Sequence, residues 1–75
     1  MWTEGSIMAK GNIFHYWVKH YEEPSEKYGI NGGRISKLTL KRNGEIVYNY
    51  DRGVDIEPAD EYTELALAVI LKEYN

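Results

Sequence analysis

The sequence contains no cysteine, so disulfides and thiolate metal sites cannot stabilise the chain. Its 75 residues form one small domain, residues 1–75. In a domain of this size the free energy gained by apolar burial and the entropy cost of ordering nearly cancel. Close packing or self-association must therefore supply the stability.

Long apolar runs and a basic excess are also missing. No run approaches the roughly 18–20 apolar residues that cross a bilayer, and the first residues lack the basic start and apolar core of a signal peptide. We therefore expect a cytoplasmic protein without membrane contact. The formal net charge is −3, whereas nonspecific nucleic-acid binding requires a clearly basic surface. With two prolines and 43% hydrophobic residues, the composition is that of a folded chain.

Turn signals divide the sequence into four extended runs followed by one helix. This order predicts an α+β fold, in which a four-stranded antiparallel meander carries the C-terminal helix on one face. The strand order would differ if the long connection over residues 23–33 crossed over the sheet.

The strongest hairpin signal is Asn43-Gly44, since both central positions of a type I′ turn need a positive φ. A two-residue turn here would set Arg42 opposite Glu45 and Leu40 opposite Val47. Leu38, Leu40 and Val47 would then share the core face. The other face would carry Lys37, Thr39, Lys41, Ile46, Tyr48 and Tyr50.

A first hairpin is predicted around Gly11-Asn12, which fits a type II′ turn and sets Glu4 opposite Lys19. Its core face would be formed by Ile7, Ala9, Phe14, Tyr16 and Val18. Its other face would be formed by Trp2, Met8, Ile13, His15, Trp17 and Tyr21. A slip by one residue would exchange the two sets.

Residues 57–75 predict a helix with Pro58 in its first turn. Its core stripe is predicted to comprise Tyr62, Leu65, Ala66, Val69 and Ile70. Leu67, Leu71 and Tyr74 lie off this stripe, and the first hairpin is apolar on both faces. We therefore expect a two-fold homodimer whose contact includes Trp2, Trp17, Tyr21, Leu67, Leu71 and Tyr74.

The stretch "YGINGGR" at residues 28–34 resembles a phosphate-binding loop only in its glycine content. A P-loop or a dinucleotide-binding turn leads into a helix, whereas a strand follows here. The glycines and Asn31 are better explained as positions of positive φ where the chain reverses. Binding of a small ligand or phosphate by this loop is a third functional alternative, weaker than the protein-binding and nucleic-acid-binding alternatives given below.

The remaining polar residues form no recognisable catalytic or metal-binding pattern. The acidic stretch after Asn49 departs from the calcium-binding loop pattern and contains Arg52. His15 and His20 would point to opposite faces of one strand, so they cannot share a metal. No serine or threonine lies on a nucleophile elbow. We therefore expect no enzyme activity, no catalytic residue, no metal and no cofactor.

The connection over residues 22–33 exceeds the length of an ordinary hairpin loop, and long loops of small domains often bind partners. We predict a non-enzymatic protein-interaction module with a partner of unknown identity. The predicted contact residues are Lys27, Tyr28, Asn31, Arg34 and Arg52. The alternative is single-stranded nucleic-acid binding through the aromatic and lysine-bearing sheet face, which the net charge disfavours.

The segments "GINGGRISKL" and "NYDRG" carry a resemblance to a family. Residues 13–75 resemble a small uncharacterised family of Gram-positive bacteria and their phages. That resemblance implies a phage or prophage accessory protein that binds a host or phage protein, and it assigns no catalytic residue.

Overall fold

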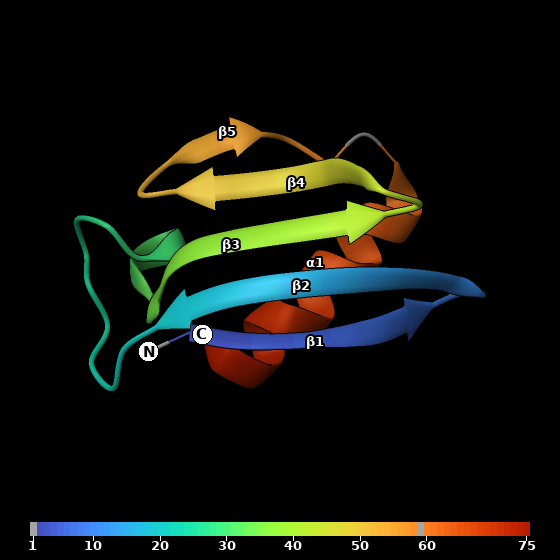
Figure 1. The fold of residues 1–75 in the computed structure, drawn as a ribbon. Helices are drawn as coiled ribbons and strands as arrows, with labels where there is room; N and C mark the ends of the chain where they lie inside the picture. Colours follow the sequence, from blue (N-terminus) through green and yellow to red (C-terminus); the bar gives the residue numbers. More distant parts are fainter. Residues whose placement is uncertain (1, 59) are drawn as a thin grey trace.

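The computed structural model describes residues 2–58 and 60–75. It contains one antiparallel sheet with a helix packed across one face (Figure 1). In chain order the elements are β1 (Trp2–Ala9), β2 (Asn12–His20), the 3-10 turn η1 (Ile30–Gly32), β3 (Ile35–Arg42), β4 (Glu45–Asp51), β5 (Val54–Ile56) and α1 (Glu61–Tyr74).

The strands are ordered β1-β2-β3-β4-β5, so the α+β meander is confirmed and the long connection makes no crossover. The expected number of four strands is wrong, because β5 adds a fifth. All three residues of β5 are exposed, which leaves no alternation of buried and exposed positions for the sequence to display. In the described part of the chain no helix is long and apolar enough to span a membrane.

The first hairpin turns one residue earlier than predicted. Lys10 and Gly11 have φ of 49° and 83°, as a type I′ turn requires, and Ala9 pairs with Asn12. Glu4 therefore faces Trp17 instead of Lys19. Because this register differs by two residues from the predicted one, each side chain keeps its predicted face. Among the predicted core residues, Ala9, Phe14, Tyr16 and Val18 are buried and Ile7 is half-buried.

The second hairpin has the predicted turn, with φ of 53° at Asn43 and 79° at Gly44. Arg42 pairs with Glu45 as expected, but Leu40 faces Tyr48 instead of Val47. A bulge between these pairs places one extra residue in β4, and such a residue exchanges the faces of all the side chains beyond it. The predicted outward orientation of Tyr48 and Tyr50 is therefore wrong, and both rings are buried.

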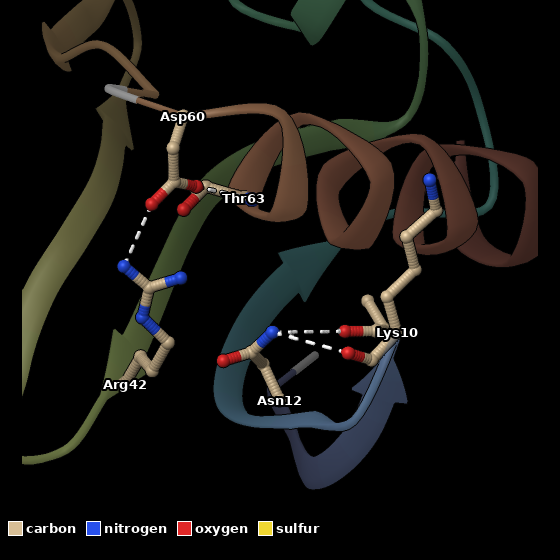
Figure 2. Close-up of polar contacts among 6 residues, drawn as sticks. Lys10, Asn12, Arg42, Asp60 and Thr63 are labelled. Carbon is tan, nitrogen blue, oxygen red and sulfur yellow. Dashed lines mark hydrogen bonds and ion pairs between the residues drawn. The ribbon is translucent and has the colours of Figure 1, made fainter.

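The helix begins at Glu61, and Pro58 precedes it instead of occupying its first turn. Asp60 is the N-cap, where its Oδ1 accepts a 2.8 Å hydrogen bond from the backbone N–H of Thr63. Its Oδ2 accepts from Nη2 of Arg42 at 2.7 Å (Figure 2). The helix start is thereby attached to the end of β3.

The helix face that packs on the sheet is rotated from the predicted stripe, of which Ala66 and Ile70 are part of the core. Thr63, Ala66 and Ile70 are buried. Three side chains off the predicted stripe pack half-buried against the core: Leu67, Leu71 and Tyr74. Three members of the predicted core stripe are instead exposed: Tyr62, Leu65 and Val69.

Candidate partner-binding site

The long connection between β2 and β3 has a defined path. The backbone N–H of Tyr21 donates to the carbonyl of Arg34 at 3.1 Å, and that of Ser25 donates to Gly33 at 2.9 Å. These bonds continue the pairing of β2 and β3 into the connection. Asn31 and Gly32 have φ of 52° and 73°, so the predicted positive φ is confirmed at these two positions, but it is wrong at Gly29 and Gly33, whose φ are −75° and −95°.

Two side chains from distant segments hold this connection on the sheet. The Asn75 amide donates to the carbonyl of Ile30 at 3.0 Å, and its Oδ1 accepts from the N–H of Ile35 at 3.0 Å. The Tyr50 hydroxyl donates to the carbonyl of Tyr28 at 3.0 Å. Since the backbone is fixed at these points, the side chains of the connection have defined directions.

A pocket of about 190 Å³ lies where this connection meets the ends of the strands. The end of β2, the start of β3 and the residue after β4 converge there, at the left in Figure 1. Its walls are formed by four cationic and four hydroxyl-bearing side chains: Lys19, Arg34, Lys37 and Arg52, with Tyr21, Ser25, Tyr28 and Ser36. Four of the nine lysines and arginines of the chain thus surround one pocket, although the net charge is −3.

The ionisation of Tyr21 reports the positive potential of this pocket. Its pKa is lowered, above all because the Lys19 side chain hydrogen bonds to the phenol oxygen. Burial opposes this shift, while the charge of Lys19, a hydrogen bond from Ser36 and the charge of Arg52 reinforce it. The cationic side chains that stabilise the phenolate form of Tyr21 also stabilise the negative charge of a bound ligand.

Aromatic rings position several of the cations. The Arg52 guanidinium carbon lies 5.5 Å from the centre of the Tyr28 ring, and Lys27 Nζ lies 5.2 Å from the same centre. Lys19 Nζ lies 5.7 Å from the centre of the Tyr21 ring. Within residues 2–58 and 60–75, the one acidic partner found at the pocket is Asp51, whose Oδ1 is 3.6 Å from Lys37 Nζ.

Arg52 has an unusual backbone. Its φ is 61°, a left-handed conformation that non-glycine residues seldom adopt. Its N–H donates to the carbonyl of Ser36 at 3.0 Å, which fixes the residue beside the start of β3. The strand end thereby directs the guanidinium toward Tyr28 and the pocket.

The structure brings together three of the five predicted contact residues, because Tyr28, Arg34 and Arg52 line the same pocket. Lys27 reaches it through its contact with the Tyr28 ring. Asn31 does not belong to it and lines a separate groove formed with α1 and β5. The sequence reasoning missed Lys19 and Lys37 as part of this site. They pair across β2 and β3, and this register was hidden by the length of the connection.

The residues predicted for self-association do not form one surface. Trp2 is exposed, Trp17 is half-buried, and both lie on the sheet face opposite α1. Tyr21 is exposed and belongs to the basic pocket. The three helix residues of that set lie against the core, as described above.

The uncovered sheet face carries a second group of aromatic and basic side chains. Trp17 donates its indole N–H to Glu4, and Lys41 Nζ lies 5.9 Å from the centre of the Trp17 ring. Lys19 Nζ lies 6.0 Å from the centre of the Trp2 ring. No grouping of three or more histidines, aspartates or glutamates that could hold a metal occurs in the part of the chain that the structure describes.

Together these features define a small α+β domain with a five-stranded meander, one helix and a basic pocket at one end of the sheet. The chain belongs to the family described as Domain of unknown function (DUF7678), whose model matches residues 1–75. The searches among curated proteins and among solved structures gave no match.

Proposed function

We propose that this protein is a non-enzymatic interaction module that binds an acidic segment of a partner protein in the basic pocket. The observation that carries the proposal is the concentration of Lys19, Arg34, Lys37 and Arg52 around one concave surface of an acidic chain. Carboxylates pair well with guanidinium groups, because the planar fork of arginine can donate two parallel hydrogen bonds.

The chemistry of the walls supports binding more than catalysis. Tyrosine and arginine supply apolar area together with directional donors, which makes them frequent energetic centres of protein interfaces. The pocket is built from strand ends and a connection whose backbone is already hydrogen bonded. A segment that enters it therefore meets prearranged donors, which limits the entropy lost on binding.

The direct test uses a short fluorescein-labelled peptide of glutamates and a matched peptide of lysines. Fluorescence polarisation should show saturable, salt-sensitive binding of the glutamate peptide alone. Amide chemical-shift changes should be confined to residues 19–37 and 51–53. Equal binding of the two peptides, or shifts centred elsewhere, would contradict the proposal.

The second candidate is single-stranded nucleic-acid binding on the uncovered sheet face. Trp2 and Trp17 with their neighbouring lysines favour it, since stacking on aromatic rings is the usual mode of such binders. Against it, Tyr48 and Tyr50 are buried on the opposite face. Polarisation with a labelled thymidine oligonucleotide at about 50 and about 200 mM salt separates the two functions, because phosphate contacts give a steep salt dependence.

We further propose that the protein is an accessory protein of phages or prophages of Gram-positive bacteria and acts in the cytoplasm. The support is the resemblance carried by "GINGGRISKL" and "NYDRG". An acidic host or phage protein is the partner expected in that setting.

A further inference from the structure

The free edge of β1 differs from the other edge of the sheet. β1 has eight residues, "WTEGSIMA", with neither proline nor lysine, and pairs with β2 without a register shift. β5, at the opposite edge, has three residues and an irregular register with β4. Edges that avoid pairing are usually short, bulged or marked by lysine and proline. β5 is short and irregular, whereas β1 is long and regular, and its one charged side chain, Glu4, accepts the indole N–H of Trp17.

The register of the first hairpin decides which backbone groups of β1 are free. Ala9 and Asn12 flank a two-residue turn, so they form a hydrogen-bonded pair, and hydrogen-bonded pairs recur at every second residue. The backbone groups of Thr3, Gly5 and Ile7 therefore face β2. Those of Glu4, Ser6 and Met8 point to the open edge, where another strand can bond to them.

One flank of α1 is apolar and exposed on the same side of the molecule. Leu67 and Leu71 line a groove with Val54 of β5, so that flank of the helix faces β5. The helical repeat of 3.6 residues puts Tyr62 and Val69 on the opposite flank, together with the exposed Glu73. Tyr62 and Val69 are exposed, at 36% and 43%. Figure 1 shows the second half of α1 lying beneath β1 and reaching the free edge.

We propose that two copies of this chain pair through β1 in antiparallel orientation and form a continuous sheet. A two-fold axis at this edge also brings together the parts of the two helix flanks that carry Val69. Strand pairing alone buries little apolar area, and the helix flanks supply the additional surface that a stable interface needs. The pairing surface includes none of the residues that line the basic pocket, although Trp2 of β1 lies beside one of them, with its ring centre 6.0 Å from Lys19 Nζ.

The side chains of β1 select the register. Centring the two-fold axis on Gly5 sets Trp2 of one copy against Met8 of the other and Glu4 against Ser6. Centring it on Glu4 would oppose two carboxylates, and centring it on Ser6 would set Glu4 against Met8. Like charges and mismatched pairs destabilise cross-strand positions. The Gly5 register pairs residues 2–8 of β1 without either conflict.

Light scattering after size exclusion at micromolar concentrations should give twice the chain mass of 8.7 kDa. Ser6→Pro removes a free-edge N–H, and Val69→Glu charges the helix flank; each should weaken dimerisation at least about tenfold. Ile46→Glu, at an exposed site on β4, is the control and should leave the mass unchanged. A mass of 8.7 kDa for the unmodified protein would overturn the proposal.

Hydrogen exchange on the unmodified protein tests the same surface without any variant. The amides of Glu4, Ser6 and Met8 should be protected in proportion to protein concentration. A dimer in which these amides exchange rapidly would contradict β1 pairing. Under mild oxidation, an equimolar mixture of Glu4→Cys and Ser6→Cys chains should cross-link more than either alone, because the Gly5 register places these positions opposite each other. Stronger cross-linking of either variant alone would overturn that register.

Discussion

Ile35 and Asn75, 40 positions apart in the sequence, are joined by a 3.0 Å hydrogen bond from the Ile35 N–H to Asn75 Oδ1. The same amide donates to the carbonyl of Ile30. One side chain after the helix thus holds both the end of the long connection and the start of β3. The geometry of the basic pocket depends on a residue outside it.

Asn75→Ala should lower the free energy of unfolding by about 1–3 kcal/mol, because two partly buried backbone groups lose their partner. It should also weaken binding of the glutamate peptide. Urea unfolding and polarisation measure the two effects. Asn12→Ala is the matched control, since its amide makes longer bonds of 3.3 and 3.4 Å to Lys10 and Ala9 in the first turn (Figure 2). Equal losses of stability in both variants would contradict this role of Asn75.

Gly29→Ala should destabilise the protein by at least about 2 kcal/mol, as expected when a backbone clash forces a shift. A Cβ at Gly29 would collide with the carbonyl of Gly33, which is backbone and cannot rotate away. Gly53→Ala is the control, because a Cβ there meets no atom within 4 Å. Removing the flexibility of glycine from the unfolded chain should make Gly53→Ala neutral or stabilising by up to about 1 kcal/mol. Thermal and urea unfolding compare the two variants.

The Asp60 cap predicts a pH dependence of stability. Hydrogen bonds from the N–H of Thr63 and then from Arg42 lower the pKa of Asp60 from 3.8 to about 2. Because the folded state favours the carboxylate, its contribution is present above the unfolded pKa and is lost as pH falls from 3.8 to about 2. Unfolding curves at several pH values should show a weaker dependence in this window for Asp60→Asn. Asp51→Asn, at the other end of β4, is the control. Identical pH profiles for Asp60→Asn and the unmodified protein would refute the assignment.

Tyr50→Phe should cost about 1 kcal/mol, because it removes the 3.0 Å hydrogen bond to the carbonyl of Tyr28. It should also increase hydrogen exchange in residues 25–30. Tyr48→Phe removes the same hydroxyl from the neighbouring buried ring and should leave exchange in the connection unchanged. If both variants loosen residues 25–30 equally, the hydroxyl of Tyr50 has no specific role.

Three substitutions test the basic pocket itself. Tyr28→Ala, Arg34→Ala and Arg52→Asn should each weaken glutamate-peptide binding about 3- to 10-fold, or about 0.7–1.4 kcal/mol. Each should change stability by less than about 1 kcal/mol, as is usual at exposed positions. Asparagine at position 52 tolerates the left-handed backbone while removing the charge. Lys10→Ala, at the far end of the sheet, is the control for net charge. Unchanged affinity in all three variants would remove the pocket from the functional proposal.

Much of the fold follows from the sequence because local rules govern it. Asn43-Gly44 specifies its turn, alternation specifies the core face of the first hairpin, and the helical repeat specifies α1. The order of elements then leaves the meander as the simplest arrangement. In the candidate site, Tyr28, Arg34 and Arg52 could be predicted from the sequence. The connection is longer than a hairpin requires, and the arginines lie within it or near it.

Tertiary structure decided two features that no local pattern specifies, the register of β4 and the rotation of α1. The bulge at Val47 turns Tyr48 and Tyr50 into the core, because a single inserted residue is a small cost compared with the burial of two aromatic rings. The packing of α1 on the sheet selects its rotation, with Ala66 and Ile70 buried, Leu67 half-buried and Val69 exposed.

The basic pocket likewise exists only in the folded chain. Lys19 and Lys37 become neighbours through the pairing of β2 with β3, and Asn75 fixes the connection between these strands. A sequence displays interactions between residues a few positions apart through its periodicity. Contacts between residues far apart in the sequence leave no such pattern, since their free energy depends on a register that only the packed domain selects.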